Sequence, residues 1–211
     1  MRDRSAPMTE EEFEALAWDK MDGLLPAVVQ DSATGQVLML GYMNRTALAA
    51  TLSSGKVTFF SRSKQRLWQK GETSGNVLRL VSVAADCDGD ALLVKAESAG
   101  PVCHLGTTAC FGAEGAEGVG FLAALSRIVH ERASADPAES YTARLLADGA
   151  AKAAQKVGEE GVELALAAVS RDREGCIEET ADLLYHLVVL MEAREFGWDD
   201  IAAVLRKRHE G

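Results

Sequence analysis

Residues 112–120, Gly-Ala-Glu-Gly-Ala-Glu-Gly-Val-Gly, join two segments of different composition. Four glycines within nine residues, without a large apolar side chain, are typical of a flexible linker. Before this linker, short apolar runs alternate with turn residues. After it, the chain is rich in Ala, Leu and Glu and has helical periodicity. The sequence therefore predicts a multidomain protein, with one domain over residues 1–111 and another over residues 121–211.

The composition excludes several classes of protein. Of the 211 residues, 47% are hydrophobic and 26% are charged, as is usual for globular chains. The formal net charge of −10 argues against a nucleic-acid-binding protein, which needs a basic face. No stretch approaches the ~18 apolar residues of a membrane helix, and the first residues lack the apolar core of a signal peptide. We expect a cytoplasmic protein that acts on small molecules and binds neither nucleic acid nor membrane.

The first segment predicts a strand-rich α+β domain. A capping box of Thr9 and Glu12 indicates a short helix to about Ala17. A second helix is expected between Asn44, a favourable N-terminal cap, and Gly55, which ends it. The remaining apolar runs predict strands over residues 26–31, 36–42, 57–61, 77–85 and 91–97.

The second segment predicts an all-α helical bundle. Residues 136–139, Asp-Pro-Ala-Glu, combine a cap, a first-turn proline and a capping-box glutamate, and so predict a helix that begins there. Short connections between helices imply antiparallel neighbours. The other helices are expected over residues 121–132, 148–170, 174–195 and 198–208.

The motif Asp86-Cys87-Asp88-Gly89-Asp90 follows an apolar run. In an extended chain, the three aspartates face one side and the cysteine faces the other. Three carboxylates suit Mg²⁺, and a thiolate suits zinc. A calcium-binding EF-hand loop is excluded because the glycine that it requires is replaced by Ala91. The alternative is an Asp/Gly-rich hairpin turn without an ion.

A second motif supplies two more thiols, Cys103 and Cys110, and the imidazole of His104. Together with Cys87, three thiolates could hold zinc and leave an open position for a water, which zinc deprotonates near neutral pH. His104 is either a fourth ligand or a proton-transfer group. An extended backbone would direct Cys103 and His104 to opposite sides, which favours proton transfer. The alternative is three buried, inert cysteines.

Residues 61–76 are long, polar and basic within an acidic chain. A loop of this composition can bind phosphates through cations and hydroxyls, and an aromatic ring in it can stack on a base. The alternative is a solvated loop with one packed tryptophan. The candidate substrate-binding residues are Arg62, Trp68, Lys70, Glu72, Thr73 and Ser74.

Taken together, these motifs resemble phosphoribosyl-AMP cyclohydrolase of histidine biosynthesis over about residues 20–111. The resemblance is carried by Leu38-Met39-Leu40-Gly41-Tyr42-Met43-Asn44, Ser61-Arg62-Ser63, Leu67-Trp68, Lys70-Gly71-Glu72-Thr73-Ser74-Gly75 and the two cysteine motifs. Leu105 and Ala109 depart from the Thr and Ser that are usual in the family.

This resemblance implies a reaction and a set of ligands. Zinc is implied on Cys87, Cys103 and Cys110, and magnesium on Asp86, Asp88 and Asp90. A homodimer with active sites at the subunit interface is also implied. In the implied reaction, a zinc-activated water opens the adenine ring of phosphoribosyl-AMP at N1–C6, and His104 handles the protons.

In the second segment, two expected helices carry acidic pairs with a spacing of three residues. Glu160 and Glu163 share one helix face, as do Glu179 and Asp182 on the next helix. Both pairs continue an apolar stripe, so they are expected to face each other and to need a divalent cation between them. We predict a magnesium site on these four carboxylates. The alternative is a set of solvated surface charges.

Two lysines precede the first acidic pair on the same helix face. Lys152 and Lys156 either form salt bridges within the helix or bind a triphosphate beside Mg²⁺. Glu159 and Glu160 are the candidates for orienting an attacking water. His186, one turn after Asp182, is expected to support the site or the core rather than to catalyse.

The second segment resembles phosphoribosyl-ATP pyrophosphohydrolase over about residues 122–211. The resemblance is carried by Ser140-Tyr141-Thr142, Lys156-Val157-Gly158-Glu159-Glu160, Glu163 and Glu179-Thr180-Ala181-Asp182-Leu183-Leu184-Tyr185-His186-Leu187. It implies Mg²⁺-dependent cleavage between the α and β phosphates of phosphoribosyl-ATP, with release of pyrophosphate.

The two resemblances predict a bifunctional hydrolase that catalyses consecutive steps. One alternative is a general nucleotide pyrophosphohydrolase fused to a zinc hydrolase. A second is a zinc-stabilised binding module with a helical dimerisation domain, which is expected to have a closed zinc site with four ligands.

Overall fold

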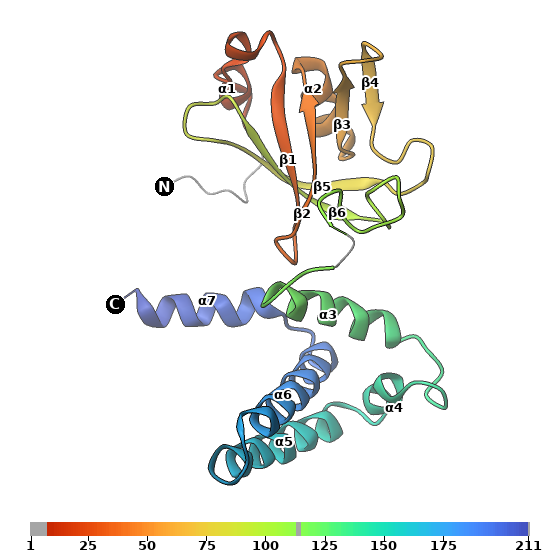
Figure 1. Ribbon diagram of the computed structural model, residues 1–211, viewed down its shortest axis with the longest axis vertical. Coiled ribbons are helices and arrows are strands. Elements are labelled where there is room, and N and C mark those ends of the chain that lie inside the picture. The colour runs from red at the N-terminus through yellow and green to blue at the C-terminus, as the bar shows by residue number, and fades with distance from the viewer. Residues whose placement is uncertain (1–7, 113–114, 211) are drawn as a thin grey trace. The chain divides into compact units, whose positions relative to one another are not determined.

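The computed structural model describes residues 8–112 and 115–210 (Figure 1). The chain divides into a first unit that ends at Phe121 and a second that begins at Leu122. The first unit is strand-rich and the second is helical, which confirms the predicted fold class. Ala113 and Glu114 of the predicted linker lie outside the described residues. Among the helices that are described, none combines the length and the apolar character needed to cross a membrane.

A mixed four-stranded sheet forms the centre of the first unit (Figure 1). Its strand order is β2-β1-β6-β5; β1 and β6 are parallel, and the other neighbours are antiparallel. Alternate residues of β1 are buried, so one face of this strand packs into the core. The strands are β1 (Leu25–Asp31), β2 (Val37–Met43), β5 (Leu78–Ala85) and β6 (Leu92–Ser98).

The helices of the first unit begin at the predicted caps. The capping box of Thr9 and Glu12 is present at α1 (Glu10–Glu14), which ends before Ala17 and is followed by a short 3₁₀ helix, η1 (Trp18–Met21). The side chain of Asn44 accepts a hydrogen bond from the backbone N–H of Ala47 at the start of α2 (Arg45–Ser54). The capping predictions are confirmed, but η1 was not predicted.

The sequence predicted a loop over residues 61–76, but only part of this stretch is a loop. Its residues 66–69 form β4 (Arg66–Gln69), which pairs with β3 (Thr58–Ser61) as a two-stranded antiparallel sheet. Phe59 pairs with Trp68, and their ring centroids are 5.5 Å apart. This cross-strand contact stabilises a short strand that is too polar to be recognised by hydrophobic alternation.

The second unit consists of helices. A hairpin of α5 (Ala150–Ser170) and α6 (Arg173–Ala193) packs with α4 (Tyr141–Ala147). The other two helices are α3 (Gly120–Arg132) and α7 (Trp198–His209). Figure 1 shows the hairpin as two long helices that run side by side. This arrangement places the acidic positions of α5 next to those of α6.

The predicted helix start at Asp136 is wrong. Asp136 accepts the backbone N–H of Ala138 but begins only a turn, and α4 begins after Ser140. The side chain of Ser140 accepts a hydrogen bond from the N–H of Ala143 and so caps the helix. Two capping residues lie close together here, and the second one starts the helix.

Candidate active sites

A pocket of about 420 Å³ in the first unit gathers predicted substrate-binding residues and two thiols. Its volume lies within the range of small-molecule sites. The predicted site residues that line it are Trp68, Lys70, Glu72, Thr73, Ser74, Cys103, His104 and Cys110. Arg62 is not part of the lining; its guanidinium carbon lies 3.8 Å from the centroid of the Tyr42 ring.

The turn after β4 brings polar side chains into this pocket. The backbone N–H of Lys70 donates to the carbonyl of Val57 at 3.0 Å, and the side chain of Lys70 is buried. Glu72 is held by the guanidinium of Arg66 at 2.8 Å, which keeps the pKa of this carboxyl below its usual value. Gly71 has a φ of +85°, which lets the chain turn sharply between these two residues.

Cys103 and Cys110 differ in their surroundings. The N–H of Leu105 and the hydroxyl of Thr107 lower the pKa of Cys103, and burial raises the pKa of Cys110. Cys103 therefore ionises more readily, and a thiolate is the form that binds a metal.

The backbone around His104 differs from the prediction. Residues 103–107 form a tight turn, in which the N–H of Cys103 donates to the carbonyl of Thr107 at 3.0 Å. The sulfur of Cys103 lies 3.9 Å from Nδ1 of His104, so the two side chains do not point to opposite sides as an extended chain would require. The argument from strand alternation was wrong here.

Cys87 lies in a different part of the first unit. It sits in the turn between β5 and β6, whereas Cys103 and Cys110 follow the far end of β6. The seven residues of β6 span about 20 Å. Within the described part of the chain, the three sulfurs do not lie within 4.8 Å of one another. A single chain therefore brings two of the three predicted zinc ligands together.

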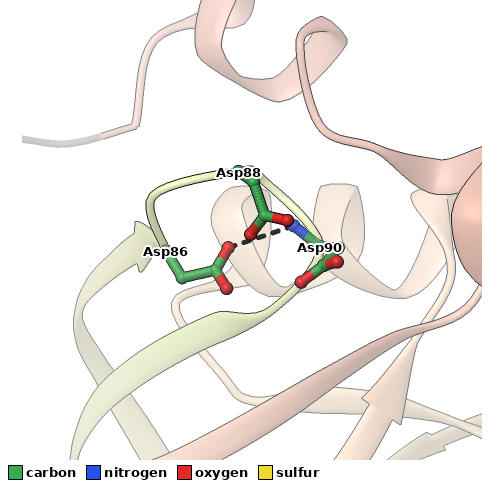
Figure 2. Close-up of side chains that lie close together, drawn as sticks. All are labelled: Asp86, Asp88 and Asp90. Carbon is green, nitrogen blue, oxygen red and sulfur yellow. Dashed lines mark hydrogen bonds between the residues drawn. The ribbon is translucent and has the colours of Figure 1, made fainter.

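Figure 2 shows the three aspartates of the turn between β5 and β6. Oδ1 of Asp86 accepts hydrogen bonds from the N–H groups of Asp90 and Ala91, at 3.0 and 3.2 Å. The backbone here is therefore a hairpin turn and not the extended chain on which the alternation argument was based. Even so, the turn brings one carboxylate oxygen from each aspartate within 4.8 Å of the others. Oxygen donors in this arrangement suit Mg²⁺.

Lys20 is a neighbour of this triplet that the sequence did not reveal. Its ammonium lies 2.5 Å from a carboxylate oxygen of Asp88 and 3.1 Å from one of Asp90. The hydrogen bonds that Lys20 donates to these aspartates raise the pKa of Lys20, and Lys20 lowers the pKa of Asp88. No local signal could have identified this contact, because the partners are 68 and 70 residues apart.

Replacing Lys20 by Met should strengthen divalent-cation binding at the triplet roughly fivefold, because a competing positive charge is removed from an exposed site. Manganese titrations followed by electron paramagnetic resonance would measure the affinity. Asp86→Asn should lose the Mn²⁺ ion that binds at this turn, and so shows which part of the titration belongs to it. Lys20→Arg keeps the charge and should bind metal as the wild type does; equal or weaker binding by Lys20→Met would contradict the prediction.

In the second unit, three of the four predicted carboxylates form one group. One oxygen each from Glu160, Glu179 and Asp182 lies within 4.8 Å of the others. Glu160 on α5 and Glu179 on α6 are each 7% exposed. Glu163 is exposed and lies outside the group.

Cations surround this group. Nζ of Lys156 lies 2.8 Å from Glu159 and 3.4 Å from Glu160, which raises the pKa of Lys156 and lowers that of Glu159. The guanidinium of Arg171 lies 2.5 Å from Glu179. Buried carboxylates that lie close together need such partners or a metal ion, because their mutual repulsion is unfavourable. The carboxylates therefore fit Mg²⁺.

The lysines predicted to bind phosphate differ in their contacts. Lys156 adjoins the carboxylate group, whereas Lys152 is exposed and its ammonium donates to the side chain of Gln155 at 3.2 Å. The sequence did not indicate Arg171, which ends α5, because its contact depends on the turn into α6.

Two family models match the chain. The phosphoribosyl-AMP cyclohydrolase family matches residues 39–112, and the phosphoribosyl-ATP pyrophosphohydrolase family matches residues 122–209. The histidine biosynthesis bifunctional protein HisIE of Escherichia coli strain K12 is 55% identical over 203 residues, that of Salmonella typhimurium strain LT2 is 54% identical, and that of Yersinia pestis is 52% identical. These alignments cover 96% of this chain and at least 99% of each relative. The chain belongs to the HisIE family.

Membership in the HisIE family confirms the predicted bifunctional hydrolase of histidine biosynthesis. The first unit carries a phosphoribosyl-AMP cyclohydrolase domain, and the second carries a phosphoribosyl-ATP pyrophosphohydrolase domain. The alternative of a binding module without enzymatic activity is excluded.

Proposed function

We propose that this HisIE-family chain is a cytoplasmic enzyme whose two domains act in sequence on one substrate. The domain over residues 121–211 hydrolyses phosphoribosyl-ATP to phosphoribosyl-AMP and pyrophosphate. The domain over residues 1–111, joined to it by the linker 112–120, then opens the adenine ring of phosphoribosyl-AMP. The convergence of Glu160, Glu179 and Asp182 from two helices is the observation that carries the first step.

In the second domain, the group of Glu160, Glu179 and Asp182 is the proposed Mg²⁺ site. Glu163 lies outside this group, on the same helix as Glu160, and is proposed as a further ligand. Magnesium bound there would neutralise the charge that develops on the leaving pyrophosphate. Lys156 binds a phosphate oxygen, and Lys152 extends the basic face one turn earlier. Glu159, fixed by Gln155 at 2.7 Å and by Lys156, orients the attacking water together with Glu160.

In the first domain, phosphoribosyl-AMP occupies the pocket beside Cys103 and Cys110. Zinc held by the thiolates would supply a water that is activated near neutral pH. Trp68 packs against the purine, and Lys70, Thr73 and Ser74 bind the phosphates, with Glu72 and Arg62 as further substrate contacts. His104 gives a proton to N1 as the C6–N1 bond breaks and the water oxygen bonds to C6.

The separation of Cys87 from the other two thiols supports a homodimer. A two-fold axis would bring Cys87 of one chain to Cys103 and Cys110 of its partner, and the same contact would form twice. The magnesium ligands Asp86, Asp88 and Asp90 flank Cys87 in the sequence and would enter the same interfacial site.

One incubation tests the proposed function. The purified chain is mixed with phosphoribosyl-ATP, Mg²⁺ and Zn²⁺, and pyrophosphate release and purine ring opening are followed together. Both signals are expected. Pyrophosphate release without ring opening would contradict the thiolate site, and hydrolysis of ordinary nucleoside triphosphates at an equal rate would contradict the assigned substrate.

Gly71→Ala should lower the ring-opening rate about 10²-fold, because a Cβ at residue 71 would lie 2.4 Å from backbone atoms of Asn76 and would displace the turn that carries Lys70 and Glu72. Gly75→Ala is the matched control: its φ of +79° is similar, but its Cβ would meet no atom within 4 Å. Steady-state rates with phosphoribosyl-AMP would measure the difference. Equal rates for the two variants would show that the close approach of residue 71 to the backbone of Asn76 does not matter for ring opening.

A further inference from the structure

Helix α4 is joined to α6 by two side-chain hydrogen bonds. The hydroxyl of Tyr141 lies 3.1 Å from Nε2 of His186, and the hydroxyl of Thr142 lies 2.8 Å from that of Tyr185. All four residues belong to motifs that the proposed reaction does not use. His186 differs from the other three because it also contacts the carboxylate group of the second domain.

The hydrogen-bond partners of His186 define its orientation. The side chain is 6% exposed, and its Nδ1 lies 3.0 Å from the backbone carbonyl of Asp182. A carbonyl only accepts, so Nδ1 carries the hydrogen. In the neutral imidazole, Nε2 on the opposite edge of the ring then accepts the hydroxyl hydrogen of Tyr141. Tyr141 thus holds the imidazole with its N–H side turned toward α5.

The same N–H side of His186 faces Glu160. Nδ1 lies 3.5 Å from Oε1 of Glu160, and Nζ of Lys156 lies 3.4 Å from that same oxygen. The N–H that His186 donates to the carbonyl of Asp182 thus also lies beside Oε1, and both His186 and Lys156 approach the Glu160 carboxylate at this oxygen. Oε2 is then the oxygen that would face a metal ion. Glu179 is arranged in the same way, because Arg171 contacts its Oε1.

We propose that Tyr141 and His186 are positioning residues that orient Glu160 so that a single oxygen faces the divalent cation. The proposal rests on the proposed Mg²⁺ site of the second domain. Hydrogen-bonded partners of metal ligands fix the orientation of those ligands, and their loss typically lowers metal affinity or activity 10–100-fold. Helix α4 therefore influences how tightly the site binds metal, although it contributes no metal ligand.

The adjacent pair provides a matched control for helix packing. Tyr141→Phe and Tyr185→Phe each remove one tyrosine hydroxyl and one hydrogen bond between α4 and α6. Only the hydroxyl of Tyr141 is bonded to His186. A purely structural role predicts similar effects of the two variants, whereas a positioning role predicts that only Tyr141→Phe alters metal binding.

The experiment measures Mn²⁺ binding to the full chain by electron paramagnetic resonance. Glu179→Gln should lose the Mn²⁺ ion bound in the second domain, and so shows which part of the titration belongs to that site. At that site, Tyr141→Phe is expected to weaken binding about 10-fold, and Tyr185→Phe to bind as the wild type does. His186→Leu should weaken binding further, and His186→Asn, which keeps an N–H near the position of Nδ1, should restore part of the loss.

A second readout separates positioning from loss of structure. For Tyr141→Phe, the Mg²⁺ concentration that half-activates pyrophosphate release should rise about 10-fold, with kcat at saturating Mg²⁺ within about threefold of wild type.

Wild-type Mn²⁺ affinity in Tyr141→Phe, an equal loss in Tyr185→Phe, or no recovery in His186→Asn relative to His186→Leu would overturn the positioning role alone. If Glu179→Gln bound as many Mn²⁺ ions as the wild type, the metal site itself would be wrong, and the positioning role would be overturned with it.

Discussion

Glu179→Gln is expected to lower pyrophosphate release from phosphoribosyl-ATP at least 10²-fold and to leave ring opening of phosphoribosyl-AMP within about twofold of wild type. The substitution keeps the shape of a buried side chain and removes one of the charges that would hold Mg²⁺. Metal ions contribute several kcal/mol to stabilising charge in such reactions, and each 1.36 kcal/mol corresponds to about tenfold in rate. Separate assays with the two substrates measure the two activities.

The matched control is Glu178→Gln. Glu178 precedes Glu179 on α6 but is exposed, and it is not part of the carboxylate group. This variant should retain both activities. A magnesium-dependent rise in melting temperature should also be present in Glu178→Gln and reduced in Glu179→Gln, because ligand binding stabilises the folded state. Equal loss of pyrophosphate release in both variants, or full activity in Glu179→Gln, would contradict the site.

Local sequence patterns predicted part of the second-domain site. The three-residue spacings of Glu160 with Glu163 and of Glu179 with Asp182 correctly placed carboxylates on two adjacent helices. Residues three apart are separated by about 60° around a helix. Which of two such carboxylates points at the neighbouring helix therefore depends on how the helices pack. That packing directs Glu160 to the group and leaves Glu163 exposed.

Backbone turns were harder to predict in the first domain than helix caps. Asn44 caps α2 through a bond to a residue three positions away, so the signal and its effect lie together in the sequence. The argument about Cys103 and His104 considered only an extended chain, although Gly106, which has a φ of +84° in the turn at residues 103–107, was a visible turn signal. The contact of Lys20 with Asp88 depends on the fold of the whole domain, and no short pattern could predict it.

The proposed homodimer makes a quantitative prediction for mixed subunits. Cys87→Ser and Cys103→Ser should each lower ring opening at least 10²-fold when assayed alone, because each removes a proposed zinc ligand. If a site takes Cys87 from one chain and Cys103 with Cys110 from the other, every mixed dimer contains one intact site. Random exchange of subunits makes half of the dimers mixed, so a mixture refolded together should recover about one quarter of wild-type activity.

A second mixture tests which residues share a chain. Cys103→Ser combined with Cys110→Ser should recover no ring-opening activity, because each site of the mixed dimer then lacks one of the two thiols that line the same pocket. Pyrophosphate release should remain at wild-type level in all three variants and in both mixtures, which controls for folding of the chain. An inactive mixture of Cys87→Ser and Cys103→Ser would contradict the shared site. Recovery by both mixtures would contradict the pairing of Cys103 with Cys110 in one chain. Cys87 is separated from Cys103 and Cys110 by the length of β6. For this reason, the mixture of Cys87→Ser with Cys103→Ser is the one expected to regain activity.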